Sequence, residues 1–289
     1  MLDYPCSNLY VEAHGAQIRQ TTTSGHPTIC FGTHTAAPES LGSAFPINAA
    51  TAGTTSVTLT TLSNYTNFTV GDPVLIQVNP FVDYNHFILN YVVSINPRTG
   101  VLGLLNPLEQ TISPNPVIAD VASLGWVHNI GWLGGTINSS DDYVFNGLAH
   151  DGGVIRDVFI NDTETGVNDV FSSSQSYGDE YTNIKLWVPC AGAFDMSSRG
   201  NSHIKIDGHS EVKETDIGGC ASNQTLSLAN TGEGVSHITF DGLHIVDATG
   251  QGSITAANTF DTKYTNITAL LRPLSPPPPA VPRWTLSRA

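Results

Sequence analysis

Hydrophobic and polar residues alternate in short stretches along most of the chain. Such alternation places one row of side chains inside a β-sheet layer and one row outside, and Gly, Asn, Ser or Asp ends each stretch. Only 12% of the residues are charged, while the chain has 27 glycines and many β-branched residues, which argues against a helical bundle or coiled coil. The pattern therefore predicts an all-β protein.

One phrase recurs in the second half of the chain: a polar residue, an isoleucine and then an alternating stretch. Its copies are Asn129–Trp132, Asn183–Leu186, His203–Ile206, His237–Phe240 and Asn266–Ala269, with a looser copy at Gly152–Ile155. The last residues of these copies are expected to point inward, and their spacings are 23, 31, 20, 34 and 29 residues: Trp132, Ile155, Leu186, Ile206, Phe240 and Ala269. A second strand recurs between the copies, as in Tyr143–Asn146 and Asp169–Ser172. Repetition at this spacing favours a solenoid of stacked coils over a β-sandwich, whose strands have no reason to repeat one phrase.

With this repeat, the chain resembles the pectate-lyase-like right-handed parallel β-helix superfamily, which includes polysaccharide lyases, polygalacturonases and phage tailspike depolymerases. Residues Val11–Ile18 are similar to the early coils of that family, and Ser56–Ile76 and Tyr91–Leu104 are similar to a β-rich insertion found in many members. The resemblance implies one single-stranded right-handed parallel β-helix over residues 1–271, with the insertion at about 50–110. The family's aspartate-rich opening motif and N-terminal capping helix are missing, so we expect the chain to be a fragment.

The rest of the composition narrows the partners and the location. A net charge of −14 argues against nucleic-acid binding. The chain contains no run of 18 or more apolar residues, so no membrane-spanning segment is predicted. Residues 272–289 hold six of the 17 prolines and predict a disordered Pro-rich tail. No signal peptide is visible at Met1–Tyr4, but the resemblance implies an extracellular or virion-associated protein.

Four cysteines form two pairs, Cys6 with Cys30 and Cys190 with Cys220, whose members are 24 and 30 residues apart. Each separation is about one coil, so the members of a pair would lie on neighbouring coils. Disulfides, which suit a secreted protein, and buried free thiols both fit this spacing.

Acidic residues precede the second recurring strand. Asp141 and Asp142 stand before one copy, Asp169 opens the next, and Asp195 lies one coil further on. An inverting glycoside hydrolase holds its two carboxyl groups roughly 6.5–9.5 Å apart, which acids on coils stacked at about 4.8 Å can reach. The stretch Asp141–Asn146 also resembles the Asp-Asp motif of polygalacturonases, which implies a catalytic role, although the other motifs of that family have no clear counterpart. Ordinary turn formation is the alternative, and no cofactor is expected unless converging Asp141, Asp142 and Asp169 bind Ca²⁺.

Basic residues offer a second constellation. Lys185 and Lys205 occupy the same place in the phrase and are expected to point outward on successive coils, with Arg199 and His209 nearby in sequence. Stacked cations would neutralise the carboxylate of a uronate, while Lys, Arg or His abstracts the neighbouring proton, as in a polysaccharide lyase. A local ion pair between Lys205 and Asp207 would explain the same residues without any function.

Aromatic residues suggest sugar-binding platforms, above all Tyr177 and the outward-facing Trp187, whereas Trp132 is expected in the core. Trp126, Tyr143 and Tyr181 are further candidates. His203 and His237 recur at one repeat position, and we expect them to stack as a structural ladder rather than to bind a metal.

The sequence thus predicts a β-helix that cleaves or binds an acidic glycan, with inverting hydrolysis by paired aspartates as the leading mechanism. A polysaccharide lyase and a non-catalytic adhesin or spike scaffold are the alternatives. If the protein is a tailspike, the resemblance implies a homotrimer.

Overall fold

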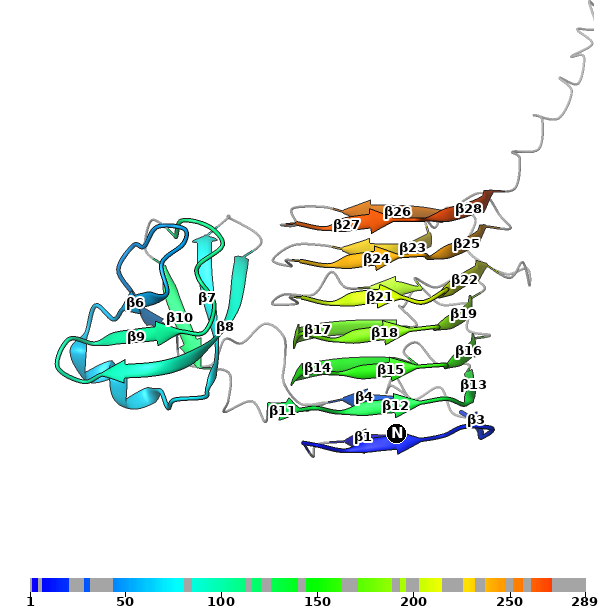
Figure 1. The fold of residues 1–289 in the computed structure, drawn as a ribbon, viewed down its shortest axis with the longest axis horizontal. Helices are drawn as coiled ribbons and strands as arrows, with labels where there is room; N and C mark the ends of the chain where they lie inside the picture. Colours follow the sequence, from blue (N-terminus) through cyan, green and yellow to red (C-terminus); the bar gives the residue numbers. More distant parts are fainter. Residues whose placement is uncertain are drawn as a thin grey trace, which may run out of the picture.

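The computed structural model describes residues 2–4, 7–20, 29–31, 44–80, 85–112, 116–120, 126–139, 144–162, 171–188, 193–195, 203–214, 226–231, 237–247, 252–256 and 261–271. Nearly every regular element in these ranges is a β-strand, so the all-β prediction is confirmed. A stack of coils forms one body, and an antiparallel sheet lies beside it (Figure 1). Among the described residues, no helix has the length and apolarity that crossing a bilayer requires.

Three parallel sheets, here named A, B and C, build the coils. Sheet A contains β1 (Leu2–Tyr4), β4 (Ile29–Phe31), β11 (Val127–His128), β14 (Phe145–Asp151), β17 (Phe171–Tyr177), β20 (Phe194–Asp195), β23 (Leu226–Thr231) and β26 (Gly252–Ala256). Sheet B contains β2 (Tyr10–Glu12), β12 (Gly131–Leu133), β15 (Val154–Arg156), β18 (Glu180–Thr182), β21 (Lys205–Asp207), β24 (Thr239–Asp241) and β27 (Lys263–Thr265). Sheet C contains β3 (Gln17–Arg19), β13 (Thr136–Ser139), β16 (Phe159–Asp162), β19 (Lys185–Val188), β22 (Glu211–Glu214), β25 (His244–Asp247) and β28 (Thr268–Leu271).

The chain runs through the sheets in the order A, B, C on each coil, and the strands of sheets B and C pair in register with those of the coils above and below. Inward residues therefore form vertical columns that fill the core. One column runs through sheet B and is apolar or aromatic at every level: Val11, Trp132, Ile155, Tyr181, Ile206, Phe240 and Tyr264. The column of sheet C contains Ile18, Ile137, Ile160, Leu186, Val212, Ile245 and Ala269. Ala269 is exposed because β28 is the last strand of its sheet.

A residue with positive φ stands two positions before each strand of sheets B and C, where the chain turns a corner. Asn129, Gly152, His203 and His237 have φ between 51° and 59° at the A–B corner, while Asn183 and Asn266 have φ of 53° at the B–C corner. Gly, Asn, Asp and His tolerate this left-handed conformation better than other residues. The recurring phrase of the sequence is thus a corner, and its copies belong to two corners. Five of the six residues expected to point inward are buried, but they divide between the columns of sheets B and C. Assigning each copy to its own corner explains the irregular spacing.

Residues 44–120 form an insertion with its own antiparallel sheet, in the order β5-β10-β7-β8-β9-β6. Its elements are β5 (Ala44–Pro46), β6 (Ser56–Thr58), the 3₁₀-helix η1 (Leu62–Asn67), β7 (Pro73–Pro80), β8 (Asn85–Asn96), β9 (Val101–Leu104) and β10 (Val117–Asp120). A bridge between Ile47 and Leu59 closes the sheet around a separate apolar core. The insertion interrupts a single strand: β4, before it, and β11, after it, pair with the two ends of β14. Its own first and last strands lie side by side, with Ala44 opposite Ala119.

The apolar core of the coils contains one buried polar network. Asp179 is 1% exposed and stands one residue before β18, a place that Ile130, Ile204 and Ile238 fill on other coils. Its Oδ2 accepts hydrogen bonds from His150 Nε2 at 2.7 Å and from Tyr181 Oη at 2.6 Å. Its Oδ1 accepts the Gly153 backbone N–H at 2.7 Å, and a side chain at Gly153 would collide with both Asp179 and His150. Satisfied in this way, a buried carboxylate is tolerated, but each of its donors depends on it.

We expect Asp179→Ala to lower the free energy of unfolding by about 3 kcal/mol or more, because it leaves three buried donors without an acceptor. Chemical denaturation followed by circular dichroism measures this loss. Glu180→Ala, at the next and exposed position, is the matched control and should change stability by about 0.5 kcal/mol or less. Equal effects of the two substitutions would contradict the importance of the network.

The corners give a second prediction, at Asn183 (φ 53°). Asn183→Ala should lower the free energy of unfolding by about 1–2 kcal/mol, because the left-handed backbone conformation is unfavourable for alanine. Asn183→Gly removes the same side chain, and with it the 2.7 Å hydrogen bond to Asp157 Oδ1, without that penalty. The glycine variant should therefore be the more stable of the two in the same denaturation experiment, and the opposite order would contradict the corner argument.

Candidate functional site

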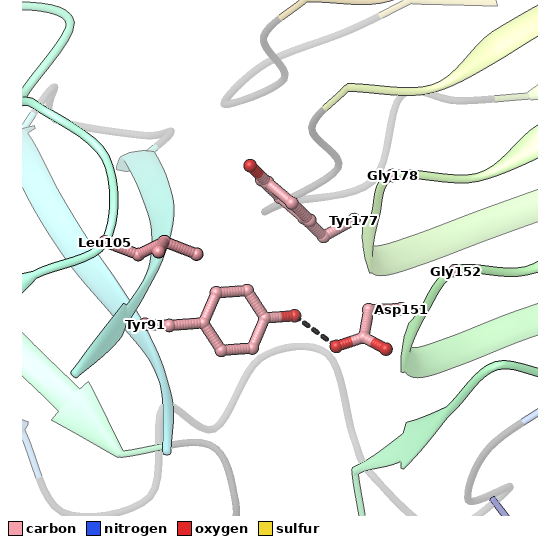
Figure 2. Close-up of a pocket in the computed structure, with 6 residues that line it drawn as sticks. All are labelled: Tyr91, Leu105, Asp151, Gly152, Tyr177 and Gly178. Carbon is pink, nitrogen blue, oxygen red and sulfur yellow. Dashed lines mark hydrogen bonds between the residues drawn. The ribbon is translucent and has the colours of Figure 1, made fainter. Parts of the chain in front are cut away.

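An open cleft of about 420 Å³ lies between the insertion and the A–B corner of the coils. Tyr91 and Leu105 reach it from the insertion, while Asp151, Gly152, Tyr177 and Gly178 line it from two neighbouring coils (Figure 2). We call these six residues the cleft.

The register of sheet A places the coil side of the cleft. Asp151 and Tyr177 are the last residues of β14 and β17 and pair directly with each other. Each is followed by a glycine with positive φ, Gly152 or Gly178, which turns the chain into sheet B. Because paired positions on stacked coils lie about 4.8 Å apart, a carboxylate and a phenol ring stand one above the other at this edge.

Asp151 is the centre of a hydrogen-bond network between the insertion and the coils. Its Oδ2 accepts from Tyr91 Oη at 2.5 Å and lies 2.8 Å from His128 Nδ1 and 3.3 Å from Trp126 Nε1. Burial, and then the bond to Asp151, raise the pKa of Tyr91 far above its usual range, so the phenol remains a donor. Among the described residues, no donor to Asp151 Oδ1 is found.

Tyr177 is held on two sides. Its hydroxyl accepts a hydrogen bond from Asn106 Nδ2 at 2.7 Å, and the Asn106 backbone is fixed by two bonds to the buried Asn90. Its ring lies edge-on to Tyr91, with 5.6 Å between the ring centroids. Burial is the main cause that raises the pKa of Tyr177, so the hydroxyl stays neutral.

A ladder of rings continues from the cleft along the A–B corner. Tyr177 lies 4.8 Å from His203, and His203 lies 4.5 Å from His237, measured between ring centroids, so the expected stacking of the two histidines is confirmed. Burial lowers the pKa of His203 to about 4, so its imidazole is neutral at neutral pH. His237 Nε2 is 2.8 Å from Glu109 Oε1 of the insertion, and its Nδ1 is 2.7 Å from Asp261 Oδ2.

The cleft combines flat aromatic faces, fixed hydroxyls and a carboxylate oxygen. Rings can stack against the apolar face of a ligand, while the polar groups hydrogen-bond its hydroxyls. This set of groups suits a polyhydroxylated ligand that presents a flat C–H face.

Of the four sequence-predicted acids, the structure describes Asp195 alone. Asp141, Asp142 and Asp169, with the Ca²⁺ site expected among them, lie outside the described residues. The backbone of Asp195 lies in β20, opposite Ser172 and Asn230. Phe194 pairs with Phe171, so the two phenylalanines occupy equivalent positions on neighbouring coils. Asp195 follows Phe194, whereas Asp169 precedes Phe171 in the sequence, so the two aspartates are not at equivalent positions. Further sequence predictions also fall outside the described residues: Arg199, the cysteines Cys6, Cys190 and Cys220, the side chain of Cys30 and the Pro-rich tail.

The expected stacking of Lys185 and Lys205 is wrong. Lys185 lies in sheet C, paired with Phe159 and Glu211, while Lys205 lies in sheet B, paired with Glu180 and Thr239. The reason is that their copies of the phrase start at different corners. Lys205 forms the ion pair with Asp207, whose hydrogen bond raises the lysine pKa. His209 is exposed at the B–C corner, with φ of 67°, and does not reach the cleft.

The aromatic candidates divide between core and surface. Trp132 and Tyr181 are buried in the column of sheet B, and Trp126 is buried beside Asp151. Trp187 is half-buried on sheet C, where Lys213 Nζ lies 4.4 Å from its ring centroid. Of these candidates, Tyr177 alone lines the cleft in the described part of the chain; Tyr143 lies outside it.

Sequence reasoning missed Asp151, Tyr91 and Glu109. Asp151 stands before Gly152 like any turn former, and its partner Tyr91 is 60 residues earlier in the chain. No local pattern links these residues, because the docking of the insertion brings them together.

Comparisons with known proteins found no matching family model and no matching curated protein. Three solved structures of phage tailspikes are similar. Tailspike gp61 of Pseudomonas phage phi297 has a TM-score of 0.52 at 9% identity, over 92% of this chain and 50% of that one. Tailspike gp49 of Pseudomonas phage LKA1 has a TM-score of 0.49 at 13% identity, over 92% and 48%. The gp54 tailspike of Acinetobacter baumannii bacteriophage AP22, in complex with a capsular saccharide of that bacterium, has a TM-score of 0.41 at 12% identity, over 93% and 52%.

The chain therefore spans about half the length of the tailspikes that it matches. The likeness to phi297 gp61 and the parallel sheets agree with the expected fold. The protein is thus a right-handed parallel β-helix, the fold that phage tailspike proteins share.

Proposed function

We propose that the protein is part of a virion-associated spike and binds a glycan in the cleft. The observation that carries this proposal is the pair of tyrosines, Tyr91 and Tyr177, fixed around the carboxylate of Asp151 at an open edge of the coils. The tailspike fold adds support by analogy. Fold alone does not determine function, so the proposal rests on the residues of the cleft.

The charge of the cleft favours a neutral glycan over the acidic one expected from the sequence. Asp151 is the charged residue in the lining, and among the described residues no Lys or Arg lines the cleft. A carboxylate with no Lys or Arg beside it in the lining would repel a polyuronate, and the whole chain carries a net charge of −14. The separation of Lys185 and Lys205 onto different sheets also removes the stacked cations on which the lyase alternative relied.

Tyr177→Ala should weaken glycan binding about tenfold, because ring stacking contributes roughly 1–1.5 kcal/mol. Tyr177→Phe keeps the ring and should lose less. Calorimetric titration with neutral and acidic bacterial polysaccharides measures both. Tyr10→Ala, at an exposed tyrosine of β2, is the matched control and should bind like the unaltered protein. Undiminished binding by Tyr177→Ala, or no binding across the panel, would refute the proposal.

Glycan cleavage is a second proposal, and it concerns the acids before sheet A. Strands β14 and β17 pair with Phe145 opposite Phe171, and the sequence has Asp142 three residues before the first and Asp169 two before the second. This register supports a pair of aspartates, Asp142 and Asp169, on neighbouring coils, as the chemistry of an inverting hydrolase requires. Asp141 is a further candidate. Asp195 is a weaker candidate because it follows its phenylalanine.

We expect Asp141→Asn, Asp142→Asn or Asp169→Asn to slow the release of reducing ends at least 100-fold if these residues act as general acid or base. Asp157→Asn, at an exposed corner where Asn is equally tolerated, is the matched control and should retain full activity. Full activity in all three variants would remove these aspartates from the reaction. Sedimentation equilibrium of the same preparations tests the homotrimer that the resemblance to tailspikes implies.

A further inference from the structure

Beyond the cleft, the ring ladder ends in a cluster that joins two coils to the insertion. Glu109 comes from the insertion between β9 and β10, and His203 and His237 stand at the A–B corners of successive coils. One carboxylate oxygen and one nitrogen of each imidazole all lie within 4.8 Å of one another.

We propose that Glu109, His203 and His237 bind a divalent transition-metal ion, with Zn²⁺ as the ion that best suits the ligands. Two imidazoles and one carboxylate form the ligand set of zinc sites that keep a fourth position open, and imidazole also suits Cu²⁺ and Ni²⁺. The proposal does not depend on glycan binding.

The distances fit such a site after a small adjustment. Metal bonds of about 2.0–2.1 Å at tetrahedral angles separate ligand atoms by about 3.3 Å. Glu109 Oε1 and His237 Nε2, now 2.8 Å apart, would separate slightly, and the His203 nitrogen already lies within 4.8 Å of both. Rotation of the Glu109 side chain can supply this separation.

Asp261 supports the site from outside. It lies one coil beyond His237, and its Oδ2 accepts from His237 Nδ1 at 2.7 Å, which directs Nε2 toward Glu109. In metal sites, a carboxylate that accepts a hydrogen bond from one ring nitrogen of a histidine orients the other nitrogen toward the metal. Lys263 Nζ, 3.1 Å from Asp261 Oδ1, holds the carboxylate in place.

The backbone also fixes both histidines. Each has a left-handed conformation, with φ of 57° at His203 and 53° at His237. Each precedes an isoleucine that is fully buried in the core, Ile204 or Ile238. The two rings are therefore presented on one edge, one coil apart, before any ion arrives. A bound ion would also tie the insertion to these coils beside Tyr177, which contacts His203.

The test uses the full chain, stripped with a chelator and titrated with ZnCl₂ or CoCl₂. We expect one tight site per chain by calorimetry, the visible absorption of tetrahedral Co²⁺, and a Tm increase of roughly 5 °C at a hundredfold excess of Zn²⁺ over Kd. The double variant His203→Ala/His237→Ala should lose the absorption and the Tm increase. Glu109→Gln, which keeps both coils unaltered, should weaken binding at least tenfold.

Two further variants separate this site from chance binding by the other histidines. Asp261→Asn should weaken binding about 10–100-fold because it removes the orienting carboxylate. His209→Ala, at an exposed left-handed corner on the other edge, should bind the ion like the unaltered protein. The proposal is overturned if the unaltered chain binds no ion, or if Glu109→Gln and the double variant bind it as tightly. Tyr177→Ala, which tests glycan binding, should keep the metal site, so the two proposals fail independently.

Discussion

Backbone hydrogen bonds between successive coils hold the β-helix together, and they form only if every coil turns through the same two corners. A left-handed residue two positions before each strand of sheets B and C makes these turns possible. Once the corners are aligned, the register of sheets B and C follows, and the inward residues of these sheets stack into columns. The edge on which the cleft and the histidine pair lie is itself a corner, so the same constraint that builds the fold also places its candidate sites.

The cleft exists because two independent cores meet. The coils bring Asp151 and Tyr177 to the ends of adjacent strands, but neither ring nor carboxylate encloses a ligand alone. The insertion adds Tyr91, Leu105 and Asn106, and the hydrogen bonds from Tyr91 to Asp151 and from Asn106 to Tyr177 join the two bodies. Polar groups at this boundary therefore attach the insertion, and in the proposed function the same groups also hydrogen-bond the glycan.

The sequence was sufficient for the fold and insufficient for the site. The repeated phrase predicted stacked coils because four of its copies combine a left-handed corner residue with a buried isoleucine, as at Asn129 and Ile130. It failed to separate two corners that use the same residue types, which is why Lys185 and Lys205 were expected to be neighbours. The core position of Trp132 and the stacking of His203 and His237 agreed with the expectation, whereas Tyr181, expected as a sugar-binding platform, is buried in the core. Asp179 breaks the pattern of isoleucines at its position and could have been noticed on that ground. Tyr91 and Glu109 could not be linked to the coils, because their contacts are made by the docking of a separately folded sheet.

The first and last strands of the insertion are hydrogen-bonded neighbours, although the insertion divides one strand of the solenoid in two. The chain thus leaves the solenoid and returns to it at nearly the same place, so the insertion occupies no more of the coil than a tight hairpin would. Modules of this construction can be exchanged, enlarged or lost without disturbing the winding of the scaffold. Since two of the six residues that line the cleft, Tyr91 and Leu105, are carried on this module, replacing it would alter the shape and chemistry of the cleft while the solenoid beneath stays the same.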